Sequence, residues 1–264
     1  MCGRGIDQVL AHPCSPEIYE HYVRSAEGYV LLAEQANGPI PRRNGSSYVW
    51  GAALGQLERM QPDARIINLE TAVTRSHDRA NKGINYRVSP ENAECLAAAK
   101  INCCVLANNH VLDWGRAGLL ETLTTLQKLN VKATGAGRND HEARAPAVLN
   151  LAKARLLIFS FGSTSSGIPF EWAAASTCCL TCARQERWKP LTKSWRSGDR
   201  AISSSFRSIG DPIGDITFRM SRRFWPGLSS TRQACRSFTG ILRIIRERSK
   251  FIEIVSFSMA AVIF

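Results

Sequence analysis

Two short apolar runs, each followed directly by polar side chains, constrain the fold of this chain more than any other feature. The run 64–69 ends at Glu70, and the run 101–107 ends at Asn108, Asn109 and His110. Short apolar runs with polar boundaries are typical of buried strands. Because α/β sheets place ligand-binding and catalytic groups at the carboxyl ends of their strands, we expect these polar side chains to share one edge of a sheet.

The rest of residues 1–175 alternates between helical and extended patterns. Leu119, Leu123 and Leu126 have helical spacing within 115–129. Ser89 is placed to cap a helix over 90–100. Further helices are expected over 16–36 and 50–60, and further strands over 131–134, 147–151 and 156–161. This alternation predicts an α/β fold.

The residues at the two strand ends are of the types that metal-assisted hydrolysis uses. Glu70 is a carboxylate and Asn109 a neutral oxygen donor, both suited to a divalent cation, and His110 can donate a proton to an anionic oxygen. A purely structural role is equally compatible, in which Asn-Asn-His forms a turn and an Asn caps the following helix. Spacing alone does not separate these two interpretations.

The positive charge of the chain is concentrated at its carboxyl end. The net charge is +12, yet residues 1–175 hold 18 Lys and Arg against 16 Asp and Glu, which leaves +10 for residues 176–264. All five His and all five Tyr lie in the first part, whereas the second is rich in Arg and Ser. The overall charge is therefore not by itself a sign of nucleic-acid binding.

The nine cysteines favour reduced thiols in the cytoplasm, because their number is odd and no secretory signal is expected. Cys103 and Cys104 lie in an apolar run, where small buried thiols are expected. Cys178, Cys179 and Cys182 resemble half of a zinc site, but no second pair follows at ligand spacing, so we expect no zinc there. No apolar run is long enough to predict a membrane span.

Six motifs distributed over residues 1–175 carry a family resemblance. They are Gly3-Arg4-Gly5-Ile6-Asp7, Ile67-Asn68-Leu69-Glu70-Thr71, Lys82-Gly83-Ile84-Asn85-Tyr86-Arg87, the segment 106–115, Gly135-Ala136-Gly137 and Ser165-Ser166-Gly167-Ile168-Pro169. Together they resemble the CapA family, the capsule or poly-γ-glutamate synthesis proteins of the calcineurin-like metallophosphatase superfamily. The resemblance implies a metallophosphatase-like sandwich of two mixed sheets flanked by helices, with metal ions at the strand ends.

The same resemblance implies roles for individual residues. Glu70 and Asn109 match metal ligands, His110 matches the catalytic or phosphate-binding histidine, and Asp113 matches the acid that orients it. The supporting positions are Asn68, Asn108, Arg4 and Asp7. The implied cofactors are divalent Mn, Fe, Zn or Mg ions, and the implied substrate is a phosphoester or a capsule-polymer precursor.

The sequence departs from the family pattern in two places. The family has Gly-Asp-x-Met before Gly-Arg-Gly, and here Met1 falls at that Met, so we expect the first strand and its Asp ligand to be absent. The family also requires a late His-Trp-Gly and a His-Gly-His cluster, whereas His141 is the last histidine of this chain. The site is therefore expected to be incomplete.

A shifted reading frame accounts for the missing histidines. Read from the third base of each codon into the next, the codons of residues 238–246 permit His-Gly-His-Ser-Ser-His-His-Pro, which is the absent motif. In the same frame, residues 206–216 permit Ser-Ile-His-Trp-Gly-Ser-Asn-Trp-Gly-Tyr. Each junction admits only about two to four residues, so such runs of matches are not an accident of a loose motif. We predict a slip of the frame between about Ala173 and Ser176.

These observations predict an incomplete CapA-like domain over 1–175 and an out-of-frame tail over 176–264 that does not adopt the family fold. We expect a protein of capsule or poly-γ-glutamate biosynthesis that has lost phosphohydrolase activity and binds metal weakly, with no nucleic-acid partner. The alternative is a non-enzymatic basic protein that contacts nucleic acid or anionic surfaces through its Arg-rich segment 243–250.

Overall fold

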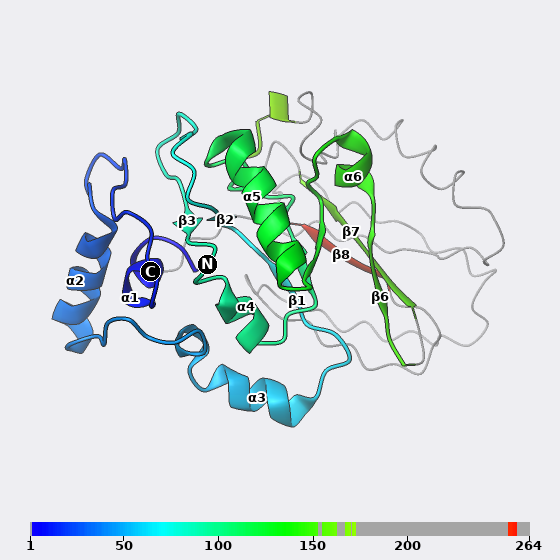
Figure 1. Ribbon diagram of the computed structural model, residues 1–264, viewed down its shortest axis with the longest axis horizontal. Helices are drawn as coiled ribbons and strands as arrows, with labels where there is room; N and C mark the ends of the chain where they lie inside the picture. The colour runs from blue at the N-terminus through cyan, green and yellow to red at the C-terminus, as the bar shows by residue number, and fades with distance from the viewer. Residues whose placement is uncertain (1, 153–154, 163–166, 170, 173–252, 258–264) are drawn as a thin grey trace, which may run out of the picture.

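The computed structural model describes residues 2–152, 155–162, 167–169, 171–172 and 253–257 (Figure 1). The helices of this part are α1 (Gly5–Val9), α2 (Ala26–Asn37), the 3-10 helix η1 (Tyr48–Trp50), α3 (Ala53–Met60), α4 (Glu94–Ala98), α5 (Gly115–Lys128) and α6 (Asp140–Arg144). The strands are β1 (Ile66–Asn68), β2 (Ala72–Val73), β3 (Arg87–Val88), β4 (Cys103–Val105), β5 (Lys132–Thr134), β6 (Ala147–Asn150), β7 (Arg155–Phe161) and β8 (Glu253–Phe257).

The sheet that carries the two polar strand ends is parallel, with the order β1-β4-β5. Its register pairs Ile67 with Cys104 and Cys104 with Ala133. The middle strand is fully buried, and both of its thiols have no exposed surface, which confirms the expected burial of Cys103 and Cys104. Because β1 and β4 run in the same direction, their carboxyl ends meet at one edge, as predicted.

A second sheet has the order β6-β7-β8, with β6 antiparallel and β8 parallel to β7. Strand β5 contacts both β6 and β7, so this sheet lies beside the first. Strands β2 and β3 form a separate parallel pair. Parallel and antiparallel strands flanked by helices confirm the predicted mixed α/β class. The sandwich of two mixed sheets stays a prediction.

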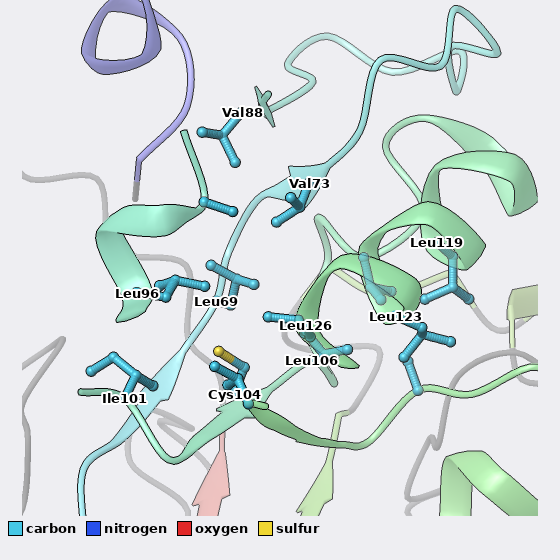
Figure 2. Close-up of a cluster of buried hydrophobic side chains, with 14 of the residues drawn as sticks. Leu69, Val73, Val88, Leu96, Ile101, Cys104, Leu106, Leu119, Leu123 and Leu126 are labelled. Carbon is cyan, nitrogen blue, oxygen red and sulfur yellow. The ribbon is translucent and has the colours of Figure 1, made fainter. Parts of the chain in front are cut away.

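A cluster of buried aliphatic side chains holds α4 and α5 to the strands that precede the site (Figure 2). Leu119 and Leu126 of α5 have no exposed surface, and Leu123 is also buried, so the leucine spacing predicted the inner face of this helix correctly. Figure 2 shows these leucines gathered with Leu106 and Val73. The residues just before the two polar strand ends are therefore fixed by packing.

The expected helix over 16–36 is wrong in its first half, because the helix begins only at Ala26. Residues before it fold back on themselves: Ala26 N donates to Pro16 O at 2.6 Å, and Ile18 N donates to Arg24 O at 3.1 Å. Ser25 then caps α2 by accepting from Glu27 N. The local turn satisfies backbone groups that a longer helix would have used.

Two other helices are shorter than expected. The segment 50–60 is interrupted at Gly51, whose φ of 49° ends η1 before α3 begins. In 90–100, Ser89 Oγ accepts from Asn92 N and caps a turn, so that α4 starts later, at Glu94. Propensity predicted the presence of these helices, and local hydrogen bonds determine where they begin.

Several expectations concern residues outside the described part. They are the Cys178, Cys179 and Cys182 group, the Arg-rich segment 243–250, and the frame slip near residues 173–176. Of the tail, the structure describes only β8. Among the described residues, none of the helices has the length and apolar character needed to cross a membrane.

Candidate functional site

A chain of side-chain amides joins the carboxyl ends of β1 and β4. Asn108 Nδ2 donates to Asn68 Oδ1 at 3.1 Å and to the backbone O of Leu69 at 3.0 Å. Asn68 Nδ2 in turn donates to Glu70 Oε1 at 2.7 Å. We call these contacts between Asn108, Asn68 and Glu70 the amide bridge. They bring together three residues that the sequence assigned to one site.

The turn after β4 is built around Asn108 and His110. Asn108 Oδ1 accepts from His110 N at 3.0 Å, an Asx turn, and Asp113 N donates to His110 O at 3.3 Å. The turn interpretation of Asn-Asn-His is thus confirmed. An Asn cap on the following helix is not, because α5 begins at Gly115 with Trp114 at its N-cap and no side-chain cap.

Asp113 orients His110 directly. Asp113 Oδ2 lies 2.8 Å from His110 Nδ1, and the carboxylate has no exposed surface, while His110 is 6% exposed. A carboxylate accepts only, so the Nδ1 atom carries the hydrogen and donates. This tautomer leaves Nε2 as the nitrogen available for exchange with another group.

Lys82 and Tyr86 complete the surroundings of Asp113, and neither is among the site residues predicted from the sequence. Lys82 Nζ lies 2.5 Å from Asp113 Oδ1 and donates to Asn109 O at 2.5 Å. Tyr86 N donates to Asp113 Oδ2 at 2.5 Å. Both residues belong to the motif 82–87 that contributes to the family resemblance, and that membership is the only sequence signal that points to them.

The Tyr86 ring stacks on His110, with centroids 4.1 Å apart and an interplanar angle of 25°. Burial raises the pKa of the Tyr86 hydroxyl, which keeps it neutral. The Arg4 guanidinium lies 5.1 Å from the centre of the Tyr86 ring and 4.0 Å from that of the Tyr29 ring. Arg4 also pairs with the buried Glu20 at 2.6 Å. Arg4 therefore acts on His110 indirectly, because it contacts the Tyr86 ring that stacks on the imidazole.

Asp7 supports the surrounding fold. Its buried carboxylate accepts from Cys14 N at 2.7 Å, Ser89 N at 3.1 Å and Asn92 Nδ2 at 2.7 Å. Desolvation by burial raises the pKa of this carboxyl, an effect that the three hydrogen bonds oppose. These bonds tie α1 to the segment that leads into α4.

The oxygen donors implied for a metal ion form only part of a site. Asn109 Oδ1 is buried and has no hydrogen-bond partner, which suits a cation ligand. Glu70 contributes a carboxylate at the same edge through the amide bridge. However, the described residues contain no group of three or more His, Cys, Asp or Glu side chains that could hold a metal ion. The described residues thus supply two oxygen donors toward such a site, Glu70 and Asn109.

Comparisons with known proteins agree with the resemblance. The family model described as "Bacterial capsule synthesis protein PGA_cap" matches residues 1–204. Proteins of two Mycobacterium tuberculosis strains, both named "Probable polyglutamine synthesis accessory protein", are 42% identical over 176 residues, which cover 66% of this chain and 46% of each relative. An uncharacterized protein of Sinorhizobium fredii is 35% identical over 104 residues, 37% of this chain and 23% of its own length. The chain thus spans less than half of these relatives.

Replacing Asp113 should destabilise the fold. In Asp113→Ala, His110 Nδ1, Tyr86 N and Lys82 lose their shared acceptor, so we expect the free energy of unfolding to fall by about 3 kcal/mol or more. The matched control is Asp140→Ala, whose pair with Arg144 is exposed and should contribute about 0.5 kcal/mol or less. Urea denaturation measures both variants. Equal losses would show that Asp113 does not organise the site.

Proposed function

The chain belongs to the bacterial capsule synthesis protein family, and from this premise we propose that it is a protein of capsule or poly-γ-glutamate biosynthesis. The match over residues 1–204 and the 42% identity to proteins named for polyglutamine synthesis support this role. The matching region covers 46% of the length of those relatives. The activity that we assign to the whole protein is therefore part of the proposal.

The chemistry that we propose for the site is that of phosphoester cleavage on a phosphoester or capsule-polymer precursor. The observation that carries it is the buried Asp113–His110 contact, which directs the Nδ1 hydrogen to the carboxylate and leaves Nε2 to accept a proton and then return it. Lys82 balances the negative charge of Asp113. This arrangement suits a histidine that steadies charge on a phosphoryl oxygen.

We further propose that the metal site is incomplete in this chain. Glu70 and Asn109 are the donors that would contribute to holding Mn, Fe, Zn or Mg in an intact relative, where the ion would supply Lewis-acid activation of water. The absence of any histidine after His141 in the sequence is the reason that we expect weak binding here. The proposed cause is the frame slip near residues 173–176, which removes the late histidines from the translated sequence.

Metal titration tests the incomplete site. Calorimetric titration of the full chain with Mn²⁺ or Zn²⁺ should show no tight stoichiometric binding. A version translated in the shifted frame after residue 173 should bind the metal ion about 100-fold more tightly or better. Loss of a residue that only hydrogen-bonds a metal ligand already lowers metal affinity about 10–100-fold, and here the ligands themselves are restored. Tight binding at one or two ions per unmodified chain would contradict the proposal.

The coding DNA tests the frame slip. The gene should carry an uninterrupted family-like sequence in the shifted frame after the codons of residues 173–176, including His-Gly-His-Ser-Ser-His-His-Pro beneath residues 238–246. Sequencing both strands of the genomic DNA measures this directly. Stop codons in the shifted frame would rule out the slip, and would leave the family membership unaffected.

Restoration of polymer tests the biological role. In a poly-γ-glutamate-producing strain that lacks its own family member, the frame-restored gene, with codons for the family's first strand and Gly-Asp-x placed before Met1, should return polymer yield, and the unmodified gene should not. His110→Ala in the restored gene should abolish the gain, since general acid–base groups contribute about 100-fold or more to rate. The exposed His141 provides the matched control, His141→Ala, which should keep the full yield. A restored gene that yields no polymer would contradict the capsule role.

A further inference from the structure

Two thiols outside the candidate site lie directly opposite each other. Cys2 Sγ is 3.7 Å from Cys95 Sγ, although the residues are 93 positions apart in the sequence. Both cysteines are free. Cys95 lies on α4 and is 1% exposed, whereas Cys2 is partly exposed and packs against the main hydrophobic cluster. The Cys2 thiol is thus partly accessible to solvent, and the Cys95 thiol beside it is buried.

The two sulfurs differ in reactivity. The hydrogen bond from Cys95 Sγ is the largest cause that lowers the pKa of the Cys2 thiol to about 7, so a large fraction is thiolate at neutral pH. The same contact and burial raise the pKa of Cys95. Burial also raises the pKa of Cys14 and Cys103 to about 12, and that of Cys104 well above its usual value. Among the described thiols, Cys2 is therefore the preferred nucleophile.

We propose that Cys2 and Cys95 form an oxidation-sensitive pair, which a low-molecular-weight disulfide converts into an intramolecular disulfide. The Cys2 thiolate attacks one sulfur of the small disulfide and expels one small thiolate. The Cys95 thiol then loses its proton and attacks the Cys2 sulfur, which expels the second small thiolate. Two protein thiols are oxidised, one small disulfide is reduced to two thiols, and the sulfurs close to about 2.05 Å.

A Cys2–Cys95 disulfide would restrain the N-terminal segment that includes Arg4, which supports the His110 ring through Tyr86. Gly3, the next residue, packs so tightly that an added Cβ would lie 2.6 Å from Arg87 O, and Arg4 N donates to the same oxygen at 3.3 Å. Arg4 then supports Tyr86 and through it His110. A Cys2–Cys95 bond would staple this segment to α4 and hold Arg4 in place. The proposal does not depend on the capsule role.

Disulfide mapping on the full chain tests the proposal. After reduction and removal of reductant, the protein is treated with oxidised glutathione, alkylated and digested with trypsin. We expect one linked product that joins the peptide ending at Arg4 to residues 88–100, which hold Cys95 as their only cysteine. Its yield should rise through about pH 7, where Cys2 ionises. The oxidised chain should unfold about 5–15 °C higher than the reduced chain, because the closed loop is long.

Control variants separate this pair from other thiols. Serine in place of Cys178, Cys179, Cys182 and Cys235 should leave the linked peptide unchanged, while Cys2→Ser and Cys95→Ser should each abolish it. A mixed disulfide of Cys2 with glutathione as the end product, or a bond from Cys2 to another cysteine, would overturn the proposal. An unchanged unfolding temperature after complete linkage would overturn the stapling of the segment.

Discussion

The Asp113 carboxylate links two segments that are distant in the sequence and that together form the candidate site. It meets His110 Nδ1 at 2.8 Å, Tyr86 N at 2.5 Å and Lys82 Nζ at 2.5 Å, with no surface exposed to water. A carboxylate removed from water is costly unless its partners compensate, so the loop 80–86 has to fold onto the turn after β4. The same carboxylate therefore fixes both the orientation of His110 and the path of the loop 80–86.

Part of this arrangement could be predicted from the sequence. Apolar runs that end in Glu70 and in Asn108 identify the strand ends. The leucine spacing predicts α5 with an end one residue later than the observed end at Lys128. The start of α2 could not be predicted, because a backbone hydrogen bond from Ala26 to Pro16 competes with the helix. The roles of Lys82 and Tyr86 could not either. They act from a loop without periodicity, and each contact joins residues 27 positions apart, Lys82 to Asn109 and Tyr86 to Asp113.

The N-terminal segment connects the features that the fold places around the site. Arg4 supports the Tyr86 ring, and Cys2, two residues earlier, faces Cys95 on α4. Arg4 and Tyr86 both lie within residues 1–204, the part that matches the capsule synthesis family. The thiol pair is a property of this chain's own side chains, and it makes the support of His110 sensitive to its chemical surroundings.

The amide bridge has a consequence for folding. Asn108 can donate to Asn68 Oδ1 and to the backbone O of Leu69 only while Asn68 pairs with Val105 across the two parallel strands. A slip of β1 by one residue would carry Asn68 about 3.3 Å along the sheet and turn it to the opposite face. The two hydrogen bonds from Asn108 to the end of β1 would then be lost together. The amide bridge can therefore form only when β1 and β4 pair in the correct register. A sheet with a shifted register would not assemble the candidate site.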